Sequence, residues 1–354
     1  VAGFDLTFSP VKSVSALWAL APREVAAKIE QAHQAAIADA IAYIEEHALF
    51  TREGKDGARQ VESRGLIAAA FTHRDSRAGD PDLHTHVAVA NKVQTKQGKW
   101  LSIYGRVLHQ HVVAASETYN TALERHLGEA VGVRFAERPG ADREKRPIRE
   151  IVGVDRELCE AWSRRRADIV ARQRELTRDF RKAHGRTPAP VEAVALAQQA
   201  NLETREAKHE PRSLADQRTT WRSQADDVLG SPDTVDQMVQ AALHPTGVPA
   251  PANISTWWVR ELAERVLGEL ETRRATWQSW HVHAEVHRQI RDAGLLAELV
   301  AQRAALEFLY RAFGQFGDLV VVADEAVEDV RLAFVERVGP ALGRHRNLAR
   351  DPHL

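Results

Sequence analysis

Alternating apolar and polar residues open the chain and predict a β-strand. The apolar residues are Phe4, Leu6 and Phe8, and the polar residues are Asp5, Thr7 and Ser9. A strict period of two is typical of a half-buried strand whose apolar side chains share the buried face. The carboxylate of Asp5 is therefore expected to point away from that face.

Two further strands predict a convergence of three histidines. Residues 84–90 are rich in β-branched residues, and His84 and His86 stand two apart, which puts both rings on one face of a strand. Residues 66–73 read as a buried strand that ends at His73, and a Gly-Asp-Pro turn joins the two segments. The third ring should therefore lie beside the other two.

Three converging imidazoles favour a metal site. A lone histidine would be interpreted as an ordinary polar strand residue, but neutral imidazole is the commonest metal ligand, and His73, His84 and His86 share one face. The single cysteine, Cys159, excludes a disulfide framework and a cysteine-based zinc site, and it agrees with a reducing cytoplasm. Any metal must be held by histidine and carboxylate side chains.

The residues after the first strand predict a helix start. Ser9 should be the N-cap, with Pro10 at the first helical position and Lys12 in the first turn. A lysine there is unfavourable because the helix N-terminus is already partly positive. Free amides, a serine hydroxyl and a cation together suit a phosphate group, and a solvated lysine is the alternative.

Helical periodicity dominates the rest of the chain. The expected helices cover residues 22–50, 105–130 and 155–185, three that begin near Pro190, Ser213 and Ser231, and residues 255–274 and 276–293. Short strands are expected at residues 133–137 and 148–152, a hairpin loop at 51–60 and a linker at 244–254.

These elements predict an α+β fold, in which a mainly antiparallel sheet has helices packed on one face and an all-α region comes after it. We expect three domains: a core at residues 1–153, a helical extension at 154–245 that could bind DNA, and a helical C-terminal region at 246–354.

Charge is balanced overall but not locally. The net charge of −1 predicts no partner, because a neutral sum can hide basic faces. Residues 134–186 hold 16 Lys+Arg against 10 Asp+Glu, on a predicted helix of up to about 40 Å. Such a run is usually a solvated face, yet it could follow a nucleic-acid backbone. His283 and His287 lie four apart on another predicted helix and, without a third ligand, should form a surface pair.

The composition is that of a soluble globular protein. Apolar residues make up 44% of the 354 residues, and no apolar run approaches the roughly 20 residues that cross a bilayer, so no membrane insertion is expected. The start at Val1 shows neither a basic leader nor an initiator methionine. We therefore interpret the N-terminus as a cut.

Two long motifs carry a resemblance to a known family. Residues 3–15 (GFDLTFSPVKSVS) and 73–91 (HRDSRAGDPDLHTHVAVAN) resemble the relaxase domain of TrwC-type conjugative relaxases, the MobF group of the HUH endonucleases. Both motifs occur in the family's order, and the resemblance covers roughly residues 1–153. The helical stretch 162–281 resembles the region C-terminal to this domain in actinobacterial members.

The resemblance implies a palm-like antiparallel sheet on which His73, His84 and His86 hold one divalent ion (Mg, Mn or Zn) over the scissile phosphate. The implied activity is a relaxase or nickase of the bacterial cytoplasm, which transfers single-stranded DNA at a transfer origin to a tyrosine, with other conjugation proteins as further partners. Asp5 falls on a family aspartate that orients one metal histidine and activates the nucleophile. Residues expected near the DNA are Arg77, which matches a family arginine, and Arg74, Ser9 and Lys12, which we assign from charge and position.

The chain departs from the family in two ways. No residue matches the attacking tyrosine, and Tyr43, Tyr104, Tyr119 and Tyr310 are better explained as packing aromatics. The phosphate-binding loop of the family's helicase is also missing. We interpret the chain as the middle of a larger protein or as a remnant, inactive as this fragment.

Two other functions remain open. A metal-dependent hydrolase with three histidine ligands would act on a small molecule in a closed pocket, and its response to DNA would not depend on salt. An inert remnant would bind single-stranded DNA with or without metal.

Overall fold

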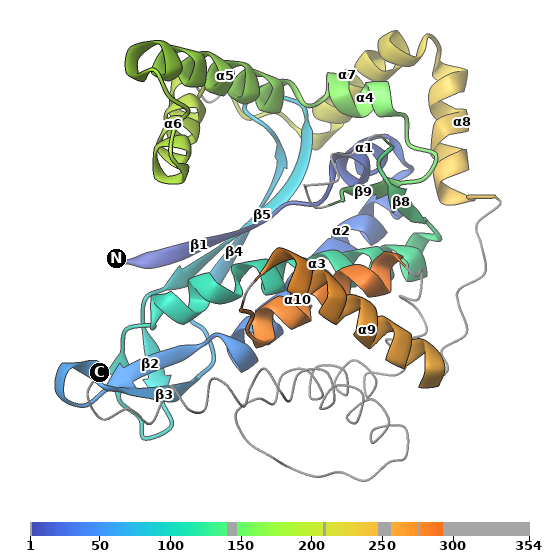
Figure 1. The fold of residues 1–354 in the computed structure, drawn as a ribbon. Helices are drawn as coiled ribbons and strands as arrows, with labels where there is room; N and C mark the ends of the chain where they lie inside the picture. Colours follow the sequence, from blue (N-terminus) through green and yellow to red (C-terminus); the bar gives the residue numbers. More distant parts are fainter. Residues whose placement is uncertain (1, 140–146, 208–209, 247–255, 275, 293–354) are drawn as a thin grey trace. The chain divides into compact units, whose positions relative to one another are not determined.

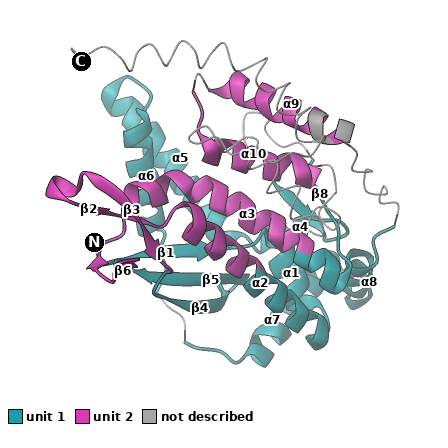
Figure 2. Ribbon diagram, turned by 90° about the horizontal axis from the view of Figure 1, so that it is seen from below, with its two compact units in different colours: residues 1–35, 66–93, 126–248 teal, residues 36–65, 94–125, 249–354 magenta. Residues whose placement is uncertain are grey.

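The computed structural model describes residues 2–139, 147–207, 210–246, 256–274 and 276–292. It divides into two compact units, which Figure 2 distinguishes by colour. The first comprises residues 1–35, 66–93 and 126–248, and the second comprises residues 36–65, 94–125 and 249–354. The predicted linker at 244–254 lies largely outside the described residues. No described helix combines the length and apolar character that crossing a membrane requires.

The first unit is built around a three-stranded antiparallel sheet (Figure 1). The strands are β1 (Gly3–Phe8), β4 (Ala68–Asp75) and β5 (Pro81–Ala90), in the order β1-β5-β4. The register puts Thr7 opposite His86 and His73 opposite His84. The predicted alternation is confirmed in β1, where Asp5 is exposed and Phe8 is buried.

The prediction of a buried strand at residues 66–73 is wrong. In the described part of the chain, β4 pairs with β5 alone, and nearly all of it is exposed. Phe71 keeps 55% of its surface accessible. An apolar run looks the same in sequence whether its strand lies at the centre or at the edge of a sheet, which explains the error.

Two helices cover the buried face of β5. They are α1 (Lys12–Leu20), which is buried from Ser13 to Leu20, and the first half of α2 (Arg23–His47), whose residues up to 35 belong to this unit. On that face of β5, Leu83, Val87 and Val89 are buried, and the hydroxyl of Thr85 lies 2.9 Å from Nε2 of His33 on α2. The helix start predicted at Ser9 is wrong, because α1 begins at Lys12 after Val11, which makes no side-chain cap.

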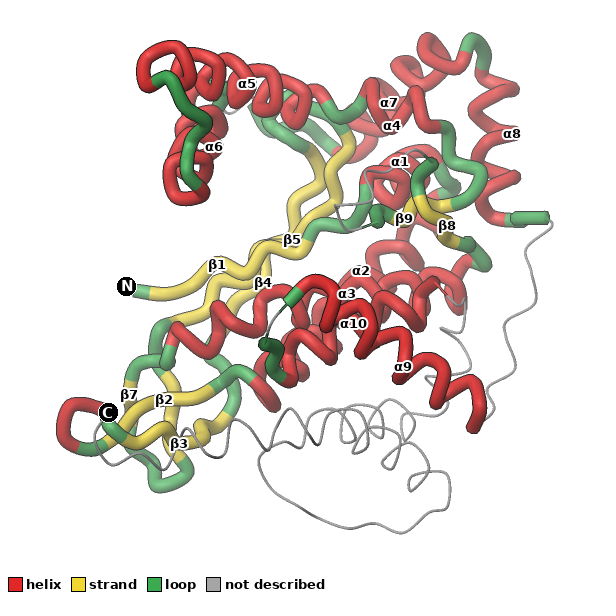
Figure 3. The backbone as a smooth tube through the Cα atoms, in the orientation of Figure 1, coloured by secondary structure: helices red, strands yellow, loops and turns green. Residues whose placement is uncertain are grey.

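A short hairpin and five helices complete the first unit (Figure 3). The hairpin strands are β8 (Phe135–Glu137) and β9 (Arg149–Ile151), and the helices are α4 (Arg156–Ala161), α5 (Arg164–His184), α6 (Pro190–Glu203), α7 (Leu214–Leu229) and α8 (Pro232–Leu243). The predicted caps at Asp155, Ser213 and Ser231 are confirmed, since each side chain accepts a backbone N–H. The single helix predicted over 155–185 is interrupted at Trp162, which is 2% exposed and donates to Gln224.

The second unit contains a four-stranded sheet and helices. The strands are arranged in the order β2-β3-β6-β7, with β2 (Phe50–Glu53), β3 (Arg59–Arg64), β6 (Val93–Thr95) and β7 (Trp100–Leu101). Residues 51–60, predicted as a loop, therefore belong mainly to a hairpin, whose turn holds a short 3-10 helix, Lys55–Gly57. The described helices are the second half of α2 (residues 36–47), most of α3 (Gly105–Val131), α9 (Thr256–Arg273) and α10 (Ser279–Asp292).

The histidines of α10 are not a surface pair. His287 is 7% exposed, and the ring of His283 lies 4.5 Å from it. Arg288 and Arg291 on the same helix both bind the buried carboxylate of Glu117 on α3, which draws this face of α10 inward. Glu117 lies 174 positions before Arg291, so the sequence of α10 alone could not reveal that this face of the helix is buried.

Candidate metal centre

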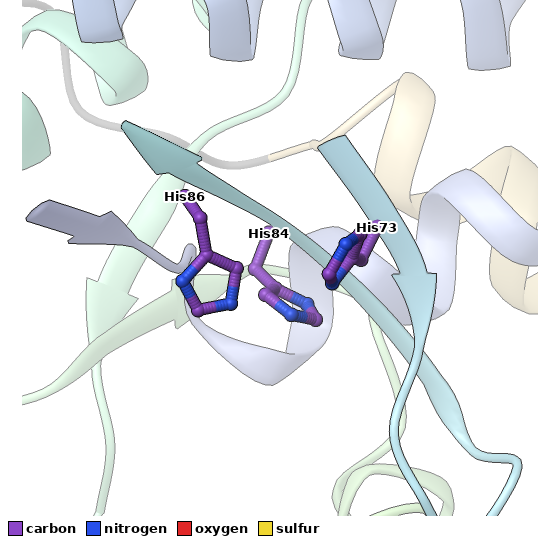
Figure 4. Close-up of side chains that lie close together, drawn as sticks. All are labelled: His73, His84 and His86. Carbon is purple, nitrogen blue, oxygen red and sulfur yellow. The ribbon is translucent and has the colours of Figure 1, made fainter. Parts of the chain in front are cut away.

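The three histidines predicted to converge lie on one hairpin (Figure 4). His84 and His86 project from β5, and His73 lies opposite His84 on β4. Their ring centroids are 5.1, 5.2 and 5.3 Å apart. One nitrogen of each ring lies within 4.8 Å of the other two, so small side-chain rotations would let the three nitrogens share one ion.

Hydrogen bonds fix which nitrogen of two rings is available. Nδ1 of His84 lies 2.7 Å from the backbone oxygen of Asp82, which can only accept, so Nδ1 of the neutral ring carries the proton. Nδ1 of His86 lies 2.9 and 3.0 Å from the two carboxylate oxygens of Asp5 and donates in the same way. Nε2 of both rings therefore keeps its lone pair, as a metal ligand must.

The cation predicted to bind phosphate is engaged within the protein. Nζ of Lys12 donates to the backbone oxygen of Pro81 at 2.8 Å and lies 3.5 Å from a carboxylate oxygen of Asp82. Lys12 thus balances the carboxylate nearest to His84. Its contact with a nucleic-acid phosphate stays a prediction.

The N-terminus of α1 holds a carboxylate of the protein itself. The amide of Ser13 donates to Oε2 of Glu150 at 3.1 Å, and its hydroxyl donates to the same oxygen at 2.5 Å. The arrangement predicted from Ser9, with its hydroxyl at the helix start, does not form, because Glu150 of β9 supplies the anion. Ser9 is exposed beside β1.

The two predicted arginines differ in their surroundings. Arg74 is exposed on β4 close to His73. Arg77 lies in the turn between β4 and β5 and donates to the backbone oxygen of Glu206 at 2.9 Å. The roles of both arginines at DNA stay predictions.

The turn between β4 and β5 is held by residues that the sequence analysis missed. Asp80, 1% exposed, accepts from the backbone amide and from Nε of Arg164 at 3.2 and 2.7 Å. Trp221 donates to the backbone oxygen of Gly79 at 2.9 Å, and Gln217 donates to Asp75 at 2.8 Å. These partners lie 84 to 142 positions away along the chain, so no local signal marks them. The start of α5 and the first half of α7 therefore support the hairpin that carries the histidines.

Comparisons with known proteins agree with this geometry. Residues 1–228 match the model of the family described as TrwC relaxase. The multifunctional conjugation protein TraI of Escherichia coli is 32% identical over an alignment of 179 residues, and the match covers 44% of this chain and 10% of that protein. The chain thus spans about a tenth of the length of its curated relatives.

Solved structures of one relaxase are also similar. The conjugative relaxase TrwC in complex with oriT DNA, in a copper-bound structure, is 26% identical with a TM-score of 0.51, over 64% of this chain and 71% of that chain. TrwC complexed with a 27-mer DNA that comprises the recognition hairpin and the cleavage site is 28% identical with a TM-score of 0.50, over 64% and 74%. With the family match covering well over half of its residues, the chain belongs to the TrwC relaxase family.

Proposed function

We propose that this chain is the DNA-processing part of a conjugative relaxase, which binds single-stranded DNA at a transfer origin and holds its scissile phosphate at the histidine triad. The observation that carries the proposal is the convergence of His73, His84 and His86 beside Asp5 on the exposed face of the sheet. The relatives named for conjugation, and TrwC bound to oriT DNA, support it.

The triad suits one divalent ion, with Mg, Mn and Zn as candidates. Its three ligands are neutral, so a bound ion would keep its full positive charge and stabilise the developing charge on a phosphate oxygen. Asp5 orients His86, and the backbone of Asp82 orients His84, so each ring is held in the tautomer whose Nε2 is available to an ion. The exposure of His73 leaves the site open to a polymer.

The nucleophile is the missing part of this mechanism. Relaxase chemistry stores the phosphodiester on a tyrosine, which must lie in line with the bound phosphate. Tyr43 and Tyr119 are 5% and 3% exposed, and the hydroxyl of Tyr43 lies 2.8 Å from Nδ1 of His111. The ring of Tyr104 lies under the guanidinium of Arg52, and Tyr310 lies outside the described residues. Our proposal is that residues 1–354 bind metal and DNA but form no covalent DNA adduct.

Metal content and adduct formation test the proposal together. His84→Ala should abolish stoichiometric binding of a divalent ion, measured by mass spectrometry and calorimetry. His109→Ala, which removes an exposed histidine of α3, should not. Full metal content in the His84→Ala protein would show that the site is elsewhere.

The second readout is a denaturing gel after incubation with a labelled origin oligonucleotide. The protein should retain the oligonucleotide under native conditions and give no shifted band under denaturing conditions. A covalent band would identify a nucleophile within this chain. Metal binding with a flat salt titration of oligonucleotide binding would favour the small-molecule hydrolase, and salt-sensitive DNA binding that ignores the triad would favour the inert remnant.

A further inference from the structure

Helix α5 has two sides of different character. One side packs on α6, where Arg165 donates to Asn201 at 2.6 Å and Arg172 donates to Glu203 at 2.6 Å. Leu176, the buried residue of α5, lies on the same side. The arginines of this side therefore serve the packing of the two helices.

The other side of α5 carries four exposed cations. They are Arg174, Arg178, Arg181 and Lys182. At 3.6 residues per turn they fall within about 100° of arc, roughly opposite the side that packs on α6. Within the described residues, none of the four side chains has a hydrogen-bond or ion-pair partner. We call these four residues the α5 cationic face.

The carboxylates of the helix border this face and do not lie among its four cations. The acidic residues of α5 are Asp168, Glu175 and Asp179, and the same helical geometry puts all three between the face and the side that packs on α6, where Glu175 pairs with Arg172 at 2.8 Å. Gln173 and Thr177 join the four cations in lining one open depression along the helix. The face thus offers four positive charges and two neutral hydrogen-bonding groups.

The helix that carries the α5 cationic face is bound at its first residue to the hairpin of the histidine site. Arg164 begins α5 and binds Asp80 in the turn that joins the histidine strands. Arg174 lies ten residues further, about 15 Å along the helix axis, and the face extends for about 12 Å beyond it. A strand that continues past the triad could therefore be followed by this helix.

We infer that the α5 cationic face binds the phosphodiester backbone of the nucleic acid that the chain processes. Unpaired cations in a row fit a polymer with regularly spaced anions, and such contacts read charge rather than sequence. The inference rests on the proposed function for its choice of nucleic acid as the partner. An anionic membrane surface is the competing partner and forms an outcome of the test.

The test compares two pairs of charge removals on the whole chain. Arg174→Ala with Arg178→Ala removes two charges from the face and keeps good helix formers on an exposed surface, so α5 should stay folded. Arg23→Ala with Lys28→Ala removes two exposed charges from α2 in the same unit. Circular dichroism checks that both proteins keep their helices.

The measured quantity is the affinity for oligonucleotides of unrelated sequence, single-stranded and duplex, as a function of salt. For the α5 pair, the slope of log affinity against log salt should fall by about 1.4 with a single strand and about 1.8 with a duplex, and affinity near 0.15 M salt should drop roughly tenfold. The α2 pair should change the slope much less. The inference would be overturned if the α5 and α2 double variants lost oligonucleotide affinity equally, or if the α5 double variant lost none.

A further arm separates this result from other outcomes. Sedimentation with phosphatidylserine vesicles identifies a membrane partner: loss of vesicle binding by the α5 pair, with DNA binding intact, would overturn the inference. Because the oligonucleotides carry no origin and no cleavage is scored, failure of the proposed function at the triad would leave these slopes as they are.

Discussion

Asp5 is the residue that connects β1 to the metal centre. Its carboxylate accepts from Nδ1 of His86, while Thr7, two residues along the same strand face, lies 3.2 Å from that nitrogen. The Asp5 side chain is 60% exposed, so its charge is well hydrated and its main effect is on the orientation of the ring. It therefore acts through His86 rather than on a bound strand.

Replacing Asp5 with alanine should lower the affinity of the triad for a divalent ion by about 10- to 100-fold, because His86 loses the partner that fixes its tautomer. Affinity for single-stranded DNA should change little. Calorimetric titration with Mn²⁺ and with an oligonucleotide measures the two effects. Thr7→Val is the matched control and should cost less metal affinity, since the Asp5 carboxylate remains. Equal metal affinity in the Asp5→Ala and unmodified proteins would exclude the orienting role.

At the scale of elements, the start of α5 holds the β4–β5 hairpin through an asymmetric ion pair. Asp80 is 1% exposed, whereas the side chain of Arg164 is 51% exposed. Removal of the arginine leaves a buried carboxylate without its counter-ion, but removal of the acidic charge leaves an arginine that water can solvate. Removal of the arginine should therefore lower the free energy of unfolding more than removal of the acidic charge.

Arg164→Ala should lower the free energy of unfolding by about 3 kcal/mol, near the lower limit for breaking a buried pair because the arginine is half exposed. Asp80→Asn should cost less, because the amide oxygen can still accept from the backbone amide of residue 164. The double variant should recover part of the Arg164→Ala loss, which urea unfolding at several pH values can measure. If the losses of unfolding free energy in the two single variants simply added up in the double variant, the Arg164→Ala loss would not come from a buried Asp80 charge.

Elements with local signals could be predicted from the sequence, and elements fixed by distant partners could not. The alternation in β1, the histidine spacing in β5 and the caps at Ser213 and Ser231 all depend on residues within a few positions. These features placed the triad and Asp5.

The missed features depend on long-range contacts. The start of α1 depends on Glu150, which lies 137 positions from Ser13, and the break before α5 accompanies the burial of Trp162 against α7. The exposure of β4 depends on its place at the edge of the sheet, which strand order alone decides. Periodicity describes the faces of an element but not the neighbours that cover them.

At the scale of the whole molecule, buried neutral histidines occur in both units. Burial lowers the pKa of His33 to about 4, with a smaller contribution from the charge of His84. Burial likewise lowers the pKa of His111 to about 4 and that of His287 to about 3. The first of these residues lies in the first unit and the other two lie in the second.

These shifts predict that the chain loses stability as the pH falls from about 6.5 towards 4. Above about 6.5 the histidines are neutral in both states, so they add no pH dependence. Below it the unfolded chain binds more protons than the folded chain, and stability falls by up to about 1.4 kcal/mol per pH unit for each histidine. Urea unfolding between pH 7.5 and 4.5, followed by circular dichroism, measures the slope.

His287→Phe removes one of these protonation sites and should make the loss of stability with falling pH less steep by about one proton. Nδ1 of His287 is buried without a hydrogen-bond partner among the described residues, so the change leaves no donor unsatisfied there. A slope that is unchanged in this variant, or no loss of stability down to pH 4.5, would contradict the assignment.

The register of the sheet also bears on the order in which the metal centre assembles during folding. The three histidines share one hairpin, which needs only a short turn to close, whereas Asp5 reaches His86 across 81 positions of sequence. Closing the longer loop costs more chain entropy and depends on non-local pairing, the slower kind of event in folding. The three histidines can therefore come together early in folding. The carboxylate of Asp5, which orients His86, joins them only when β1 pairs with β5. An isolated β4–β5 hairpin would have the same donors as the folded protein but would hold an ion less tightly.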